Sequence, residues 1–98
     1  MLIKTHKSYR NVVAICDSDL IGKKFEQGNM QIDLSGEFFN GEEKTGKEAL
    51  SIIKDAVRED ATFNIVGEQS CALAIQAGII EQKGVKKIHN MPVALTLL

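Results

Sequence analysis

Residues 62–78 contain a short apolar run, a glycine and a run of helix formers, and this order constrains the fold more than any other stretch. Residues 62–66 are rich in β-branched and aromatic side chains, which suit a half-buried strand. Gly67 interrupts the run, and residues 68–77 are mostly good helix formers. Gly78 follows where a left-handed helix C-cap is expected. The pattern therefore predicts a strand that turns sharply at Gly67 into a helix.

The turn at Gly67 has a structural and a functional interpretation. A strand-to-helix turn commonly uses glycine because other residues do not tolerate its dihedral angles. The same glycine would let a phosphate or carboxylate approach the unpaired N–H groups of the first helical turn. Glu68 would repel such an anion, and the chain contains no glycine-rich phosphate loop, so the structural interpretation is favoured.

Asn64 is the residue of this stretch that the structural interpretation does not explain. An amide inside an apolar strand needs hydrogen-bond partners, because burying it unpaired costs about 1–3 kcal/mol. It therefore either braces a neighbouring loop or faces a ligand. The candidate site for a small anion or a metal–phosphate ligand consists of Asn64, Gly67, Glu68, Asp17 and Lys23.

Composition excludes several classes of protein. The chain has 98 residues, 44% of them hydrophobic and 26% charged, which predicts a single globular domain over residues 1–98. A net charge of −1 gives the whole surface no preference for a strongly basic or acidic partner. No apolar run approaches the ~20 residues that cross a bilayer, and charged residues interrupt the N-terminal stretch. We therefore expect a cytoplasmic protein with no membrane partner.

The rest of the pattern predicts more strands and one more helix. Thr45-x-x-Glu48 is a capping box, and the apolar stripe after it predicts a helix that lies on a sheet face. We expect an α+β fold with two layers, in which a largely antiparallel or mixed sheet carries two helices on one face. Apolar runs and alternation predict the other strands at residues 2–7, 11–16, 30–34, 85–89 and 93–98.

Side chains that could bind a metal form no complete set. Asp17 and Asp19 could hold Mg²⁺ together with phosphate oxygens, although Asp-Ser-Asp is also ordinary turn chemistry. His6 and His89 have no Cys or His at the spacing of a zinc site. We expect neither a metal nor another cofactor.

Two cysteines are the candidate nucleophiles. Cys71 falls in the first turn of the predicted helix, where a thiol pKa can be lowered enough for catalysis beside a His. Cys16 lies in an apolar run. A packing role is favoured for both, because free cysteine is among the most buried residue types. The chain is thus more typical of a binding protein than of an enzyme.

Basic residues gather in the terminal segments although the net charge is close to zero. If the first and last strands are neighbours, these residues form a patch that could contact RNA phosphates, with Tyr9 placed to stack on a base. A solvated rim balanced by acidic residues is the alternative. The expected partner is RNA or a ribonucleoprotein. The candidate nucleic-acid-binding residues are Lys4, Lys7, Tyr9, Arg10, Lys86 and Lys87.

The apolar C-terminal segment, residues 93–98, points to a further partner. A strand of this composition at the edge of a sheet offers unpaired main-chain groups to another chain. We therefore expect that a second copy could pair with it and form a homo-oligomer.

Several segments together resemble an archaeal family known as domain of unknown function 424. The resemblance spans nearly the whole chain and implies an archaeal, cytoplasmic protein, of a kind often associated with translation. It implies no activity, substrate or cofactor, so no catalytic residue is carried over. The family has a His soon after the final Pro, whereas Val93 follows Pro92 here, and a role for that His does not transfer. The matching pieces are Ile15-Cys16-Asp17, Leu20-Ile21-Gly22-Lys23, Phe25, Gly28, Phe38-Phe39-Asn40-Gly41, Asn64-Ile65-Val66-Gly67-Glu68 and Pro92.

Overall fold

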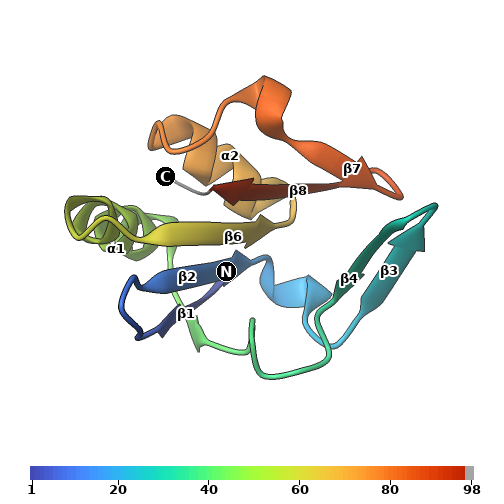
Figure 1. Ribbon diagram of the computed structural model, residues 1–98, viewed down its shortest axis with the longest axis horizontal. Coiled ribbons are helices and arrows are strands. Elements are labelled where there is room, and N and C mark those ends of the chain that lie inside the picture. Colours follow the sequence, from blue (N-terminus) through green and yellow to red (C-terminus); the bar gives the residue numbers. More distant parts are fainter. Residues whose placement is uncertain (97–98) are drawn as a thin grey trace.

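The computed structural model describes residues 1–96 and has the α+β fold that the sequence predicts. Six strands form one mixed sheet in the order β5-β1-β2-β6-β8-β7, and two more form a separate hairpin (Figure 1). Strands β2 and β6 are parallel, and the other paired strands are antiparallel. The sheet strands are β1 (Leu2–His6), β2 (Val12–Cys16), β5 (Glu42–Glu43), β6 (Thr62–Val66), β7 (Lys86–Ile88) and β8 (Met91–Thr96), and the hairpin strands are β3 (Lys24–Gln27) and β4 (Met30–Asp33).

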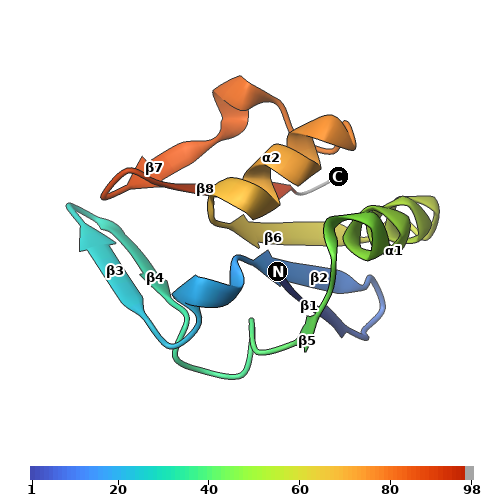
Figure 2. The ribbon, with the colours of Figure 1, turned by 180° about the vertical axis from the view of Figure 1, so that it is seen from behind.

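Both α-helices lie on one face of the six-stranded sheet, as predicted (Figure 2). Helix α1 (Gly46–Arg58) connects β5 to β6 and buries Ala49, Ile53 and Ala56. Helix α2 (Glu68–Gln76) follows β6 directly. The two helices share a core with the strand side chains that alternate toward them. Two short 3₁₀ turns complete the elements, η1 (Ser18–Leu20) and η2 (Gln82–Gly84).

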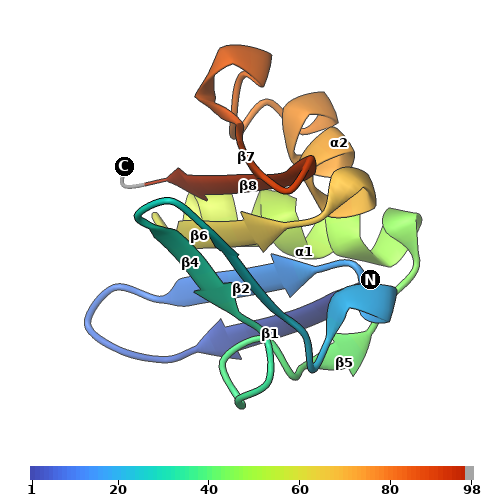
Figure 3. The same ribbon diagram turned by 90° about the vertical axis from the view of Figure 1, so that its right-hand side faces the viewer.

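The opposite face is covered by the β3–β4 hairpin and the loop after it (Figure 3). Leu34 and Phe39 from this side pack with Cys16 into a second core. Strand β2 is therefore buried on both faces, with Ile15 in the core under the helices and Cys16 in the core under the hairpin. This position explains why residues 12–16 are continuously apolar.

His89 joins the hairpin to the sheet. It lies with Asn90 in the two-residue turn between β7 and β8, and both have positive φ angles, of 50° and 65°. A turn of this kind matches the twist of the two strands that it connects. The main-chain N–H of His89 donates to Oε1 of Gln27 at 2.8 Å, and its ring donates to the carbonyl of Glu26. The end of the hairpin is thereby held against the β7–β8 turn.

The structure also differs from the prediction at three places. Strands β3 and β5 were not predicted, because neither has an apolar run or a clear alternation. The predicted free edge at the C-terminus is wrong for the first part of β8, which lies between β6 and β7. Residues 97 and 98 of that predicted strand lie outside the described part of the chain. Homo-oligomerisation itself stays a prediction.

No helix among residues 1–96 has the length and apolar character that crossing a membrane requires.

The predicted capping box at the start of α1 is confirmed and can be tested. The hydroxyl of Thr45 accepts from the N–H of Glu48 at 3.2 Å, and the Glu48 carboxylate accepts from the N–H of Thr45 at 3.0 Å. We expect Thr45→Ala to lower the free energy of unfolding by about 1 kcal/mol in urea titrations. Thr45→Ser keeps the hydroxyl and should change it by only a few tenths. Equal losses in the two variants would contradict a role for the cap.

Candidate functional site

The parallel strands β2 and β6 end side by side, and Asp17 and Gly67 follow them. The N–H of Asp17 donates to the carbonyl of Val66 at 3.0 Å, and the N–H of Gly67 donates to the carbonyl of Pro92 at 2.9 Å. These bonds extend the sheet by one residue on each strand. In doubly wound α/β sheets, ligands bind outside the carboxyl ends of parallel strands. The ends of β2 and β6, the parallel pair of this mixed sheet, are therefore a candidate position for a site.

The carboxylate of Asp17 occupies the start of α2. Its Oδ1 accepts from the N–H and the hydroxyl of Ser70, at 2.8 and 2.7 Å, and its Oδ2 accepts from the N–H of Gln69 at 3.1 Å. Both Asp17 and Ser70 are buried. The main-chain donors of the first helical turn are thus paired with a side chain that comes from 52 residues earlier in the chain.

Gly67 is required by this contact as well as by its own conformation. It has a φ angle of +110°, which side-chain-bearing residues rarely adopt. A Cβ atom at this position would lie 2.3 Å from Cγ of Asp17 and 2.5 and 2.6 Å from its two oxygens. Glycine is therefore needed at position 67 for its backbone conformation and also because the Asp17 carboxylate leaves no room for a side chain. The second reason cannot be seen in the sequence.

The predicted ligand site does not assemble at the turn. An anion at the N-terminus of α2 would have to displace the carboxylate of Asp17 from the N–H groups of Gln69 and Ser70. Glu68 and Asp17 do line one shared cavity of about 430 Å³, but Lys23 is exposed and does not line it. Lys23, the one cation among the predicted site residues, therefore takes no part in this cavity.

Asn64 lies away from the turn, near the middle of the sheet. It pairs with Ala14 on β2 and with Leu95 on β8, and its parity in the strand matches that of Val66, which faces the hairpin. Within residues 1–96, no atom of its side-chain amide is sealed from solvent without a hydrogen-bond partner. Asn64 is thus half-buried on the sheet face that the hairpin covers only in part.

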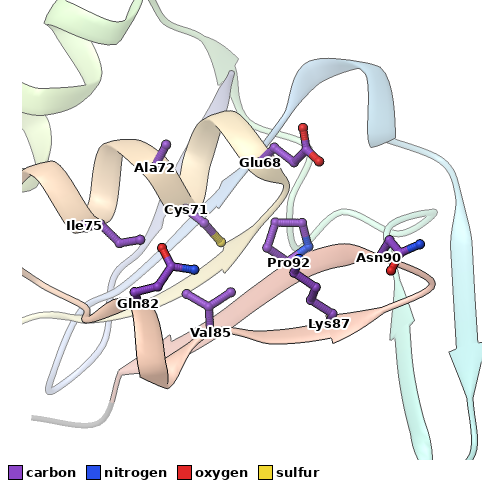
Figure 4. Close-up of a pocket in the computed structure, with 9 residues that line it drawn as sticks. All are labelled: Glu68, Cys71, Ala72, Ile75, Gln82, Val85, Lys87, Asn90 and Pro92. Carbon is purple, nitrogen blue, oxygen red and sulfur yellow. The ribbon is translucent and has the colours of Figure 1, made fainter.

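A second cavity lies on the helix side of the same end (Figure 4). It encloses about 340 Å³ between α2 and the β7–β8 hairpin, and it shares Glu68 and Asn90 with the first cavity. Cys71 reaches its wall beside Pro92. No group of three or more His, Cys, Asp or Glu side chains within the described residues is arranged to hold a metal ion.

The two thiols are buried and unfit for nucleophilic chemistry. Burial, reinforced by the nearby Asp17 carboxylate, raises the pKa of Cys16 and of Cys71 to about 11. Burial and this carboxylate raise the pKa of Cys71 although the thiol lies in the first turn of α2. Both thiols are therefore neutral at physiological pH.

The predicted basic patch is split in two. Strands β2, β6 and β8 separate β1 from β7, so the condition that the first and last strands are neighbours does not hold. Lys86 and Lys87 lie on the edge strand β7 and point to opposite faces, since Lys87 lines the cavity on the helix side. The remaining four candidates lie on β1 and in the turn after it.

The guanidinium of Arg10 holds two turns of the fold together. Its Nε donates to the carbonyl of Asp60 at 2.7 Å, and its terminal nitrogen lies 3.2 Å from the Asp60 carboxylate. Asp60 has a positive φ of 61° at the end of the α1–β6 connection, and the guanidinium ties this turn to the turn between β1 and β2. Arg10, one of the predicted nucleic-acid-binding residues, therefore has a structural role.

Sequence reasoning missed an aromatic stack beside the other basic residues. The rings of His6 and Phe38 lie 4.4 Å apart at an angle of 12°, and Nε2 of His6 donates to the carbonyl of Phe38 at 2.8 Å. Nζ of Lys4 donates to the neighbouring carbonyl of Glu37 at 2.8 Å. The alternation of β1 places Lys4 and His6 on one face, but nothing local connects them to a loop 32 residues away.

A double-mutant cycle tests the contact between Asp17 and Gly67. Gly67→Ala should lower the free energy of unfolding by more than about 3 kcal/mol, because the new methyl group overlaps the carboxylate in a strained backbone. With Asp17→Ala already present, the same substitution should cost only about 1–2 kcal/mol, the backbone strain alone. Urea unfolding of the four proteins gives the coupling. Additive effects would refute the contact.

The thiols give a pH-dependent test. The unfolded chain loses its thiol protons near a pKa of 9.0, whereas the folded chain keeps them up to about 11. The stabilisation from neutral buried thiols is therefore fully present below pH 9 and is lost as the pH rises towards 11. The free energy of unfolding should fall over this range, and less so in a Cys16→Ala, Cys71→Ala variant.

A thiol reagent at pH 8 should modify the native protein only as fast as it unfolds, and rapid labelling would contradict burial.

Comparison with known proteins agrees with this fold. No curated protein matches the chain. The structure is similar to an uncharacterized conserved protein from Methanopyrus kandleri, with a TM-score of 0.86 and 24% sequence identity over 97% of this chain and 88% of the other. The family model described as "Protein of unknown function (DUF424)" matches residues 5–97. This match confirms the resemblance seen in the sequence, and the chain belongs to that family.

Proposed function

We propose that the protein is a non-catalytic module that binds single-stranded RNA, free or within a ribonucleoprotein, next to β1. The surface consists of Lys4, His6, Lys7, Tyr9 and Phe38, and we call it the β1 corner. The observation that carries the proposal is the stacked pair of His6 and Phe38, which presents an aromatic face beside a lysine.

The stack provides a platform for a base. The ring of Phe38 is 42% exposed although its partner His6 holds it in place from one side. Tyr9, in the turn after β1, is fully exposed. Single-stranded nucleic acids bind to such rings by stacking, which contributes about 1–3 kcal/mol per base. Double-stranded recognition would instead need a helix or a ribbon that enters a groove.

The cations of the β1 corner suit a small number of phosphates. Lys4 is held at the carbonyl of Glu37, so its ammonium lies on the same side as the stack. Lys7, just after β1, lines a cavity on the helix side together with Asp55 and Glu59, and it makes no ion pair with any other residue from 1 to 96. The Glu37 carboxylate, 3.9 Å from Nζ of Lys4, weakens the positive potential. We therefore expect about two phosphate contacts and weak, salt-dependent binding.

The residues that enzymes would use are engaged elsewhere. The Asp17 carboxylate accepts three hydrogen bonds at the start of α2. The thiols of Cys16 and Cys71 have raised pKa values of about 11. This arrangement supports a binding role in preference to acid–base or nucleophilic catalysis.

Binding to a fluorescent single-stranded oligouridine tests the proposal. Phe38→Ala should weaken binding by about 5- to 100-fold, because one stacked base is lost. A Lys4→Ala, Lys7→Ala variant should reduce the slope of log K against log salt by about 1.4, or 0.7 for each phosphate contact. Fluorescence anisotropy over a series of KCl concentrations measures both effects.

Two exposed lysines of α1 give the matched control. Lys47→Ala with Lys54→Ala removes the same charge from the exposed surface of α1 and should leave the affinity and the slope unchanged. Affinity that does not depend on salt, or an equal loss in the control variant, would refute binding at the β1 corner.

A further inference from the structure

A groove runs between β4 and the β7–β8 end of the sheet, on the face away from the helices. Its volume is about 520 Å³. Residues 29–32 form one wall, and Lys86, Ile88, Val93 and Leu95 form the floor. We call it the hairpin groove. It takes no part in the β1 corner, which lies at the opposite end of the strand order.

Apart from Lys86, the floor of the hairpin groove is apolar, and it is accessible at Leu95. Val93 pairs with Lys86 across the β7–β8 ladder, and Leu95 lies two residues further along β8, beyond the end of β7. Leu95 is 59% exposed and is one of four large hydrophobic side chains exposed among the described residues. Because β-strand side chains alternate, Val93 and Leu95 project to the same face at a spacing that an extended chain shares.

The wall of the groove is a strand edge. Four consecutive residues of the hairpin line the groove, which means that it follows the side of β4 and not only one of its faces. Gln31 pairs with Glu26, whose carbonyl points away from the hairpin to receive the ring of His89. Opposite residues of an antiparallel pair direct their main-chain groups either towards each other or away from each other. The N–H and C=O of Gln31 therefore leave the hairpin on the opposite edge, the side of β4, whose residues line the groove.

We propose that the hairpin groove binds an extended peptide segment of another protein, which pairs with the edge of β4 and places alternate apolar side chains on Val93 and Leu95. A free main-chain edge beside an alternating apolar floor is the arrangement by which proteins add a strand from a partner.

Lys86 determines the charge that the peptide should carry. Among the described residues that line the groove, it is the one with an ionisable side chain. It makes no ion pair with the other residues up to Thr96. An acidic residue at one end of the peptide would therefore complement it, whereas a lysine there would be repelled.

The test uses the full chain and two synthetic peptides, acetyl-Thr-Val-Thr-Val-Thr-Leu-Thr-Glu-amide and the same sequence reversed. Titration followed by ¹H–¹⁵N NMR should shift the amides of residues 29–32, 86, 93 and 95, and should slow hydrogen exchange at Gln31. Binding should persist in the presence of oligouridine, because the β1 corner is separate. If neither peptide binds at about 1 mM, the proposal is overturned.

Matched variants locate the peptide. Leu95→Lys should weaken binding at least about tenfold, whereas Val57→Lys, at an exposed valine of α1, should not. Lys86→Glu should weaken binding and reverse the preference to a peptide that ends in Lys, whereas Lys87→Glu on the opposite face should do neither. Equal effects within either pair would overturn the assignment to the hairpin groove.

N-methylation of the peptide distinguishes strand pairing from simple apolar contact. Methyl groups on the amides that face β4 should abolish binding, and methyl groups on the alternate amides should be tolerated. If both sets of methylated peptides bind as well as the parent, the peptide does not pair with β4 and the proposal fails.

Discussion

The fold depends on a buried carboxylate at the point where two parallel strands end. Removing the carboxylate of Asp17 from water costs several kcal/mol, and its three hydrogen bonds from Gln69 and Ser70 offset this cost at about 1.5–3 kcal/mol each. The partial positive charge at the start of α2 stabilises the carboxylate further. The contact joins β2 to the β6–α2 unit, and it requires glycine at position 67 because a side chain there would overlap the carboxylate. One interaction thus fixes a strand end, a turn and a helix start.

This interaction also changes where a function can reside. In doubly wound α/β sheets, the crevice beyond parallel strand ends usually receives a ligand, and a helix N-terminus there supplies donors. Here the chain fills that position with Asp17, and Glu68 adds a second carboxylate at the rim. Both proposed surfaces use side chains on the hairpin side of the sheet instead. That face is closed near Cys16 and Val66 but open towards Asn64 and Leu95.

The features that could be predicted from the sequence are those that depend on residues close together in the chain. The capping box of Thr45 and Glu48, the strand at residues 62–66 and the turn at Gly67 each depend on neighbours within a few residues, and all three are observed. Contacts between distant segments could not be predicted. Asp17 and Ser70 are 53 residues apart, and His6 and Phe38 are 32 apart, so no period or motif connects either pair. The strand order could not be predicted for the same reason, because the parallel pairing of β2 with β6 depends on the crossover through α1.

The two proposed surfaces are compatible because the sheet keeps them apart. Lys4, Ala14, Asn64 and Leu95 form one row across four strands, and three strand spacings place Lys4 about 14 Å from Leu95. Ala14, between them, is buried beneath the second core. An RNA strand at the β1 corner and a peptide in the hairpin groove would therefore not compete for the same side chains. A protein that holds both at once would connect an RNA to a protein partner, which suits a component of a ribonucleoprotein better than a free-standing RNA-binding protein.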